Sequence, residues 1–359
     1  MVLAARTPRL FFQKMKTDLA VIGQGAVTPA GIGVDALIHN TPKETKVCLV
    51  SRPQHQMPVF RVGLDEPWSK RWQTEPRLRR ASAISYFLVE AGEQALAGLS
   101  VSERSQTGVV IAFSTGCLAY SRRFFESIIV QGQKSASPAL FPETVFNSPV
   151  SHVAAVLHLQ ESTYALVGDD AAWIAALKTA WLWLEQERMA QVLVLGAEEF
   201  DSACLDAYYN ARWFARRGTE SPFIPSEGAA GVLVRKARPG DSKIISQIED
   251  GFIYRSKAQA LAAGERCFDK FESGLPCYSS AGGHWLRDIE RKLNSRPAPH
   301  GDADQPAYLG EAATASSAWN TLRGLALLDQ KLPRLLIPIW GSTHQIGALK
   351  VENRAPQLV

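Results

Sequence analysis

The sequence lacks several features that define common protein classes. Its five cysteines form no CxxC pair and show no metal-ligand spacing. Charged residues make up only 21% of the chain and the formal net charge is +4, which gives no reason to expect a nucleic-acid partner. No window reaches the roughly eighteen uninterrupted apolar residues of a membrane span. These absences predict buried thiols in a reducing compartment, with no bound metal and no membrane partner.

The basic residues and the amino terminus exclude few classes of function. Residues 1–23 carry positive charge but no long apolar run before a small-residue cleavage site, so we predict no signal peptide and a soluble cytoplasmic protein. Short basic groups include Arg77, Arg79 and Arg80, and also Arg122 and Arg123. Such groups are usually solvated helix faces, and a phosphate-binding patch is the alternative.

A glycine-rich segment near the amino terminus superficially suggests a nucleotide cofactor. It reads AVIGQGAVTPAGIG and follows a short apolar strand beginning at Leu19. Gly23, Gly25 and Gly31 do not make the GxGxxG spacing, and Pro29 interrupts the place where a phosphate-binding helix should begin. The segment therefore predicts a strand and a tight turn, and no cofactor is expected.

Strands alternate with helices along the whole chain. Over 81–99, apolar residues recur every three or four positions, which predicts an amphipathic helix. The segment 171–188 would be apolar on nearly every face of a helix, which predicts an interior helix. Strands are predicted at 19–23, 108–113, 163–167, 191–195, 228–234, 244–254, 275–279, 335–340 and 347–352, and further helices at 120–131, 256–263, 285–293 and 314–330. After a turn at 238–240, which reads Arg-Pro-Gly and precedes Asp241, the pattern restarts. We predict an α/β protein with an extension at 1–16, a first half at 17–238 and a shorter second half at 239–359.

Five segments, read in order, resemble successive landmarks of β-ketoacyl-ACP synthases. They are AVIGQGAVTPAGIG, VVIAFSTGCLAYSRRFFESIIVQG, SPALFPETVFNSPVSHVAAVLHL, VLVLGAEEF and SPFIPSEGAAGVLV. The resemblance covers most of Asp18 to Lys236 in unbroken order and is weaker in the carboxyl half. It implies the thiolase fold, in which two βαβαβαββ halves pack as five layers (αβαβα), with the carboxyl half abbreviated here. Proteins of this family are usually dimeric through strands beside the active site.

The family's nucleophilic cysteine has no counterpart in this chain. In the family it stands at the start of a buried helix, where unpaired backbone N–H groups and the helix dipole favour the thiolate. The resemblance places Asp170, preceded by Asp169, at this position. A carboxylate is a poor nucleophile toward a thioester and repels a malonyl carboxylate. We therefore predict that Asp169 or Asp170 caps the helix by accepting a backbone N–H, an interaction worth about 1 kcal/mol; a catalytic carboxylate is the alternative.

The two family histidines are also replaced. The motif HGTGTxxxD appears as SAGGHWLRD, with Asp288 kept at the acidic position and Ser280 at the histidine position. A hydroxyl cannot accept a proton near neutral pH, and His284 comes four residues late, as an ordinary loop histidine would. The second histidine, of GHxxGAxG, becomes Glu311, and an acidic side chain has the wrong sign to steady a carbonyl oxygen.

The last landmark departs from the family as well. The GFGG-type loop, whose backbone completes the oxyanion hole in the family, appears as WGSTHQIGAL. Gly341 and Gly347 are kept, Ser342 replaces the gating phenylalanine, and His344 is new. Losing a nucleophile or its acid–base partner costs several orders of magnitude in rate, so four separate departures predict a pseudoenzyme rather than an enzyme.

Three functions are compatible with such a chain. The main prediction is a protein-binding adaptor, because degenerate thiolase-like proteins are similar to ones found with toxic effectors of bacterial type VI secretion systems, where they assist effector loading. The partner would then be an effector or its chaperone. Trp72, Trp213 and Trp319 are candidate interface anchors, with core positions as the alternative.

The second possibility is a chain-length factor, the inactive partner of an active ketosynthase in type II polyketide or aryl polyene assembly. Its partners would be a ketosynthase and an acyl carrier protein, and its homo- or heterodimer face would include Ser162 to Gly168. The third is an acyltransferase or ketosynthase that uses Cys277 or Cys117 with His284. Neither cysteine is predicted to begin a helix that would lower its pKa, so buried structural thiols are favoured over this third possibility.

Overall fold

The computed structural model describes residues 15–39, 46–50, 55–211, 223–278, 285–293, 309–330, 332–342 and 345–354. Its strands are β1 (Leu19–Thr28), β2 (Gly31–Ile32), β3 (Lys46–Val50), β4 (His55–Val59), β5 (Thr107–Phe113), β6 (Thr163–Val167), β7 (Gln191–Glu198), β8 (Gly228–Lys236), β9 (Lys243–Ile253), β10 (Arg334–Trp340) and β11 (Gln345–Asn353). Its helices are α1 (Val34–His39), α2 (Pro67–Gln73), α3 (Ala83–Ala95), α4 (Val101–Ser105), α5 (Leu118–Gln131), α6 (Ser148–Val156), α7 (Ala172–Glu185), α8 (Ser202–Asn210), α9 (Lys257–Phe268), α10 (Trp285–Leu293) and α11 (Ala313–Gln330).

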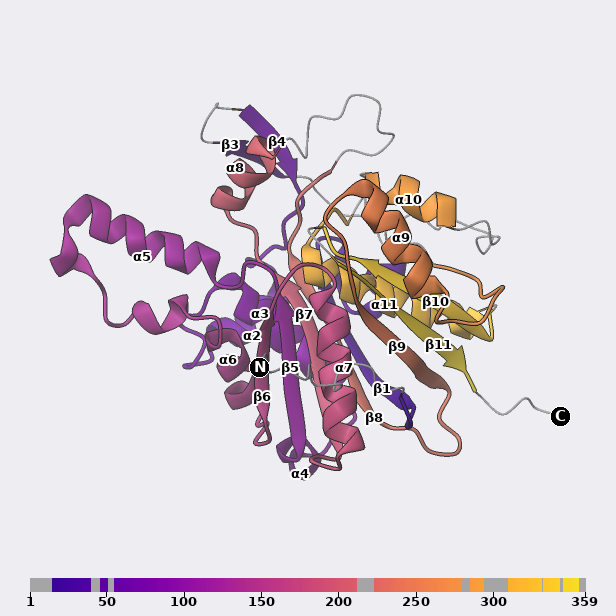
Figure 1. Cartoon of the computed structure of the whole chain (residues 1–359). Helices are drawn as coiled ribbons and strands as arrows, with labels where there is room; N and C mark the ends of the chain where they lie inside the picture. Colours follow the sequence, from indigo (N-terminus) through magenta and orange to yellow (C-terminus); the bar gives the residue numbers. More distant parts are fainter. Residues whose placement is uncertain are drawn as a thin grey trace, which may run out of the picture.

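One mixed sheet runs through the whole molecule, in the order β10-β11-β9-β1-β8-β7-β5-β6, and β3 and β4 form a separate hairpin (Figure 1). The order repeats about the contact between β1 and β9. On one side β1, β8 and β7 pair antiparallel in succession, and on the other β9, β11 and β10 do the same. Helix α7 precedes β7 as α11 precedes β10. The chain therefore consists of two corresponding halves, as the sequence predicts.

The carboxyl half is the shorter of the two. The amino half extends its sheet with β5 parallel to β7 and β6 parallel to β5. Among the described residues, the matching place beside β10 holds only an isolated parallel bridge between Cys277 and Leu336. The strand predicted at 275–279 is thus reduced to a single paired residue, with residue 279 outside the described ranges.

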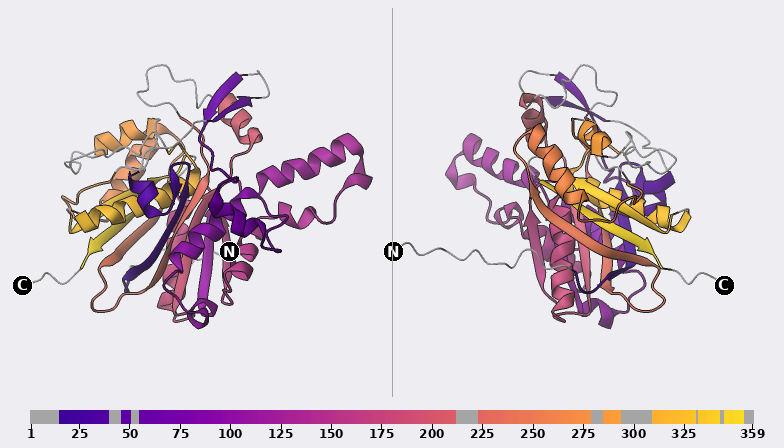
Figure 2. Two further views of the ribbon diagram at one scale, coloured as in Figure 1. Left: turned by 180° about the vertical axis from the view of Figure 1, so that it is seen from behind. Right: turned by 45° about the vertical axis from the view of Figure 1, so that its right-hand side comes forward.

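The helices and the sheet form five layers. Helices α7 and α11 each contact strands of both halves, so they form a central layer inside the curve of the sheet. Helices α3 and α6 cover the outer face of the amino half, and α9 with α10 covers the outer face of β9 and β11 (Figure 2). This is the thiolase-like arrangement expected from the sequence.

Helix α7 is interior because its side chains are apolar on nearly every face. Helix α11 is also buried, although it carries the buried polar residues Thr314, Ser316, Ser317, Asn320 and Thr321. Trp173, Trp181 and Trp319 are the largest fully buried side chains of the described residues. The Trp173 indole donates to Thr321 Oγ1 at 2.8 Å, which satisfies a polar atom that burial would otherwise leave unpaired and joins α7 to α11. The prediction of an interior helix at 171–188 is confirmed.

Strand β1 is longer than predicted because its glycines have a packing role. A Cβ atom at Gly23 would collide with the Ala95 carbonyl, and one at Gly25 with the Ala91 carbonyl, both on α3. These glycines let α3 approach the strand, rather than ending it as the turn prediction assumed. The strand continues to Thr28.

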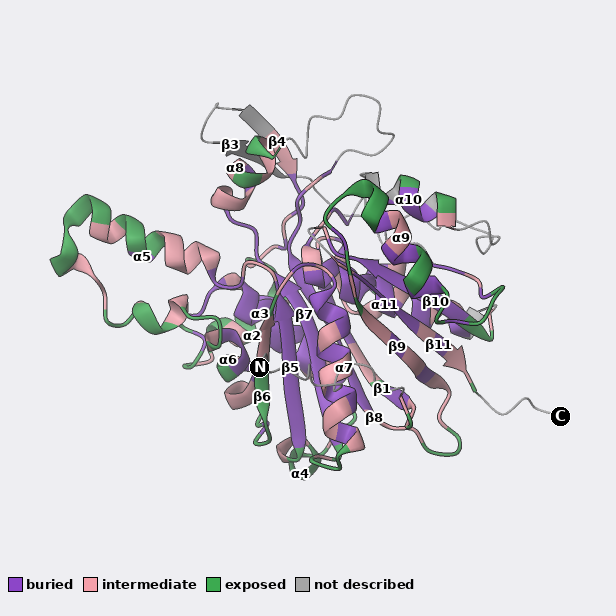
Figure 3. Cartoon of the chain, viewed as in Figure 1, coloured by how far each residue is buried: buried purple, intermediate pink, exposed green. Residues whose placement is uncertain are grey.

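Helix α5 leaves the body of the molecule as a projecting arm, and the segment to Thr144 returns beside it (Figure 1). Most of the arm is exposed or half-buried, and Phe124 is the helix's buried residue (Figure 3). Its base is fixed by Tyr120, whose hydroxyl donates to Ala81 O at 3.2 Å, and by Arg122, whose Nε donates to Asp201 Oδ1 at 2.9 Å. The arm is therefore rigidly attached at one end and uncovered along its length.

Candidate functional site

Two of the three residues at family catalytic positions lie at the same end of the central layer. Asp170 comes just before α7, and Glu311 comes just before α11. The Ser317 hydroxyl of α11 donates to Asp170 O at 2.9 Å, and Glu311 pairs through its backbone with the segment that leads into β8. Ser280, together with His284 and His344, lies outside the described residues.

The amino end of α11 is fixed against the ends of two central strands. Thr314 Oγ1 donates to Ala112 O at 2.9 Å and to Ala197 O at 3.0 Å. Gly196 of β7 allows this approach, because a Cβ atom there would lie 2.5 Å from Thr314 O. The site is therefore built on the carboxyl ends of β5 and β7, a usual place for sites in α/β proteins.

Two aspartates bind the loop between β10 and β11 to the start of α7. Asp170 Oδ2 accepts the Ser342 N–H at 3.0 Å, and Asp169 Oδ1 accepts the Gln345 side-chain amide at 3.0 Å. A Cβ atom at Gly341 would collide with the Asp169 carboxylate, and the Tyr254 hydroxyl donates to Gly341 O. We call Asp169, Asp170 and the loop residues Gly341, Ser342 and Gln345 the aspartate clamp.

The clamp revises the capping prediction. Asp169 Oδ1 also accepts the Ala171 N–H at 3.1 Å, so Asp169 bonds the backbone at the entrance to α7. Asp170 reaches across to Ser342 instead of back to its own helix. In the resemblance to ketosynthases, the N–H of this loop completes the oxyanion hole. Here the Ser342 N–H of that loop is bonded to a carboxylate of the same chain.

The environment of Asp170 opposes nucleophilic chemistry. Burial, followed by the neighbouring Asp169 carboxylate, raises the pKa of Asp170 to about 6, although the bond from Ser342 acts in the opposite direction. Some surface of the residue remains accessible, but the carboxyl group itself is desolvated. A fraction of Asp170 is therefore protonated near neutral pH, which makes an already weak nucleophile weaker.

Further acidic groups surround Tyr208 of α8. Burial raises the pKa of the Tyr208 phenol above its usual value, and Cys204, Glu198, Asp170 and Glu311 raise it further. Burial, with the charge of Glu198 next, raises the pKa of the Cys204 thiol to about 12. The surroundings of Tyr208 are thus acidic and include a thiol whose thiolate form is disfavoured, whereas the chemistry of the ketosynthase family needs a thiolate and two imidazoles.

Four carboxylates that the sequence analysis overlooked hold the loops around this site. Glu198, Glu199, Asp201 and Glu227 are each at most 6% exposed and lie at the end of β7, just after it or just before β8. The backbone N–H groups that they accept are those of Ser114 and Thr115 for Glu198, Ile84 and Ala119 for Glu199, Ala203 for Asp201, and Val62 and Phe200 for Glu227. The sequence did contain a signal for these buried carboxylates, because acidic residues stand directly beside buried strands in AEEFD and PSEGAAG.

The relocated-cysteine possibility loses its physical basis at Cys117. This residue is the N-cap of α5 and directly precedes the first helical residue, Leu118. Yet burial, with the charges of Glu199 and Glu143, raises the pKa of its thiol far above the ordinary value, so the thiolate is not favoured. Cys277 is 1% exposed within its bridge to Leu336.

The three candidate tryptophan anchors differ in their surroundings. Trp319 is fully buried and donates to Ala229 O at 3.2 Å, so the core alternative is correct for it and an interface role is not. Trp72 is half-buried, donates to Glu90 Oε2 at 2.7 Å and carries the Arg71 guanidinium 4.0 Å above its ring. Trp213 lies outside the described residues.

Exposed apolar side chains instead gather on the α5 arm and on β6. Among the described strands, β6 lies at the edge of the sheet and pairs with β5 alone, and Tyr164 and Val167 on it are each 50% exposed. On α5, Phe125 is 60% exposed and Ile129 and Val130 are each 80% exposed. The returning segment adds Phe141, Val145 and Phe146. We call these residues the arm–edge face.

Among the helices of the described residues, none has the length and apolar character to cross a membrane, and no cluster of metal-ligating side chains was found in the same ranges. These findings concern the described chain only.

The fold and the site together define a thiolase-like, ketosynthase-type protein fold. No protein-family model matches the sequence, and no curated protein does. Solved structures do match over 94% of this chain and 99% of theirs. They include the ishigamide ketosynthase/chain length factor (TM-score 0.77, 18% identity), a type II PKS acyl-carrier protein in complex with its ketosynthase (0.73, 16%) and a β-ketoacyl synthase from Burkholderia phymatum STM815 (0.74, 12%). At these identities the similarity establishes the fold.

Proposed function

We propose that this chain is a non-condensing subunit that pairs with an active ketosynthase, as a chain length factor does. The observation that carries the proposal is the aspartate clamp. Asp170 replaces the nucleophile and also occupies the Ser342 N–H that a substrate carbonyl would need. Two of the similar structures, a ketosynthase/chain length factor and a carrier-protein complex, come from assemblies in which ketosynthase folds work with partners.

The arm–edge face is the proposed pairing surface. An edge strand presents unpaired backbone N–H and C=O groups, which a strand of a second subunit can pair. The projecting α5 arm would add apolar contacts beyond the edge itself, because Ile129 and Val130 are almost fully exposed in the free chain. The face overlaps the predicted dimer segment 162–168 through Tyr164 and Val167.

A basic groove at the root of the arm is a proposed docking place for the acyl carrier protein. It holds about 550 Å³ and is lined by Arg77, Arg79 and Arg80 on one side and by the segment 138–143 on the other. All three arginines are exposed, and none forms an ion pair with a described residue. The three guanidinium charges outnumber the single carboxylate of Glu143 in the facing wall, which lies 2.8 Å from the His152 ring, so the groove is net positive. An acidic partner is favoured there.

The secretion-adaptor role remains a prediction from sequence resemblance. The same arm–edge face would serve an effector or its chaperone, and both functions require a chain without condensing activity. The identity of the bound partner separates them.

Co-purification from the native host tests the proposal. Tagged wild-type chain is expected to recover a ketosynthase in equimolar amount, and Ile129→Glu/Val130→Glu is expected to lose it while remaining folded by circular dichroism. The purified chain alone is expected to give no condensation product from malonyl- and acyl-carrier substrates. Recovery of a secretion effector in place of the ketosynthase would support the adaptor, and turnover by the chain alone would overturn both.

A further inference from the structure

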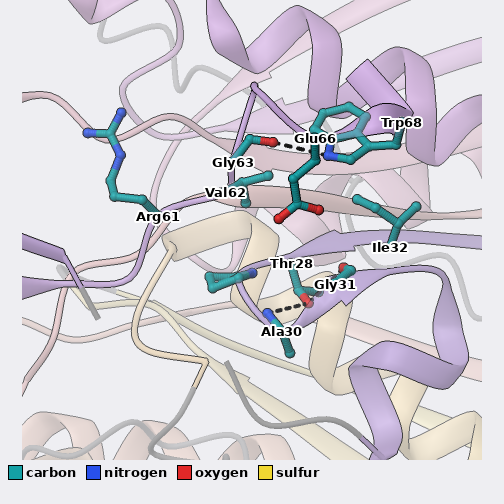
Figure 4. Close-up of a pocket in the computed structure, with 10 residues that line it drawn as sticks. Thr28, Ala30, Gly31, Ile32, Arg61, Val62, Gly63, Glu66 and Trp68 are labelled. Carbon is teal, nitrogen blue, oxygen red and sulfur yellow. Dashed lines mark hydrogen bonds between the residues drawn. The ribbon is translucent and has the colours of Figure 1, made fainter. Parts of the chain in front are cut away.

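A separate pocket of about 270 Å³ lies between the β1–β2 turn and the segment that enters α2. Its lower wall in Figure 4 is formed by residues 28–32, and its upper wall by residues 61–63 with Glu66 and Trp68. The Glu66 carboxylate points into the space between the two walls, next to the Trp68 ring (Figure 4). No part of the aspartate clamp lines it.

Most polar groups of this pocket are already paired within the chain. Thr28 Oγ1 accepts the Ala30 N–H at 3.1 Å and donates to Gly31 O at 3.1 Å. The Trp68 indole donates to Gly63 O at 3.1 Å. These bonds fix the shape of the walls and leave their hydrogen-bonding groups with little further capacity.

The charged groups leave the pocket net negative. Arg61 Nε donates at 2.7 Å to Glu227, whose side chain is 1% exposed, so the positive charge of Arg61 is balanced by a buried carboxylate. Glu66, by contrast, is exposed and has no ion-pair or hydrogen-bond partner for its carboxylate among the described residues. One uncompensated negative charge therefore faces a space otherwise walled by Ile32, Val62 and an indole ring.

We propose that this pocket binds a small monocation, a primary ammonium or guanidinium group on a short apolar body. Glu66 supplies the opposite charge, and the aromatic face of Trp68 attracts a cation that lies over it. Ile32 and Val62 contact the apolar part of the ligand. The volume is at the lower limit of small-molecule sites, which restricts the ligand to about the size of one amino-acid side chain.

Two kinds of ligand carry such a cationic group on a short apolar body. One is a free alkylamine, and the other is a lysine or arginine side chain of a partner protein. The proposal is independent of the pairing function, because none of the pocket's residues belongs to the arm–edge face. Loss of one therefore leaves the other unaffected.

Binding of n-butylammonium is the direct test, followed by the ¹H–¹⁵N signal of the Trp68 indole, which is assigned by its loss in Trp68→Phe. We expect a saturable shift in the wild type, at least tenfold weaker binding in Glu66→Gln, and unchanged binding in Asp65→Asn. Asp65 is the matched control because it is an exposed carboxylate one residue away that does not line the pocket.

A neutral control and a peptide complete the experiment. n-Butanol is expected to give no saturable shift. Tighter binding of end-blocked Gly-Lys-Gly than of n-butylammonium would identify a partner side chain as the source, and the reverse order a free amine. Equal affinity of wild type and folded Glu66→Gln, or equal binding of butanol and butylammonium, would overturn the proposal.

Discussion

At the residue scale, Asp170 occupies the position at which the resemblance to ketosynthases places a nucleophile, and its carboxylate accepts the Ser342 N–H. This bond joins the start of α7 to the loop between β10 and β11, so one side chain connects two parts of the candidate site. The resemblance to ketosynthases identified position 170 from the sequence. Its hydrogen-bond partner Ser342 lies 172 residues away along the chain, so this contact is seen only in the structure.

The clamp predicts opposite behaviour of two substitutions at Asp170. Asp170→Ala removes the acceptor for the Ser342 N–H, a bond worth about 1 kcal/mol, and is expected to speed amide exchange at Ser342 roughly fivefold. Asp170→Asn keeps a side-chain oxygen and is expected to preserve protection. Hydrogen exchange with mass spectrometry measures both. Unchanged protection in the alanine variant would show that the bond does not hold the loop.

Buried carboxyls set the pH dependence of stability. Burial raises the pKa of Glu198 and of Glu199 to about 7 and that of Asp170 to about 6. Because these values exceed the ordinary ones, the stability that they contribute is fully present below about pH 4 and is lost as pH rises through 6 to 7. We expect Tm to increase by a few degrees between pH 8 and pH 5.5.

Calorimetry over this pH range is the measurement, and Glu198→Gln is expected to reduce the slope because it removes one titrating group. Glu352 acts in the opposite direction. Its partial burial raises its pKa, but hydrogen bonds from Lys350 and Arg354 outweigh burial and hold the pKa at about 2. Its contribution to stability is therefore lost only at lower pH. A wild-type Tm that stays constant or falls toward pH 5.5 would contradict the assignment.

At the element scale, the helices and strands with strong periodicity were predictable. Segments 108–113 and 171–188 are apolar enough that burial follows directly, and both form interior elements. The β3–β4 hairpin was not predicted from the sequence. The strand at 275–279 failed for a different reason, since an apolar run forms a strand only where a neighbour pairs with it, and the described chain pairs only Cys277 there.

Charge introduced on α5 is expected to weaken association. Ile129→Glu/Val130→Glu places two carboxylates on the arm–edge face. We expect the dissociation constant of the complex between this chain and its pairing partner to rise at least tenfold, because burying unpaired charges is unfavourable. Multi-angle light scattering across a dilution series measures it. Val101→Glu is the control, since Val101 is 73% exposed on α4, far from the arm. An equal effect of both substitutions would exclude a specific face.

At the scale of the whole molecule, the two halves share one sheet and one central layer of helices. Strand β9 pairs with β1, and both central helices contact both halves. We therefore expect the boundary predicted at 238–239 to mark a repeat within one cooperative body and not a border between two independent domains. From the sequence alone this distinction was out of reach, because the restart of the pattern after residue 240 is the same in both cases.

Cleavage at the turn between β8 and β9 tests this cooperativity. A protease site inserted after Gly240, where the backbone has a φ of 94°, is expected to give fragments 1–240 and 241–359 that remain associated and unfold in a single transition. Gel filtration and calorimetry after cleavage provide the readouts. Fragments that separate and unfold cooperatively on their own would show two domains.

The exposed apolar surface of the α5 arm is also expected to affect the abundance of this protein in the cell. A chain made in excess of its partner leaves Phe125, Ile129 and Val130 in water, and such surfaces attract chaperones, proteases and other copies of the chain. Its abundance is therefore expected to follow that of the partner, with surplus copies degraded, so that deleting the partner's gene would shorten the half-life of this chain.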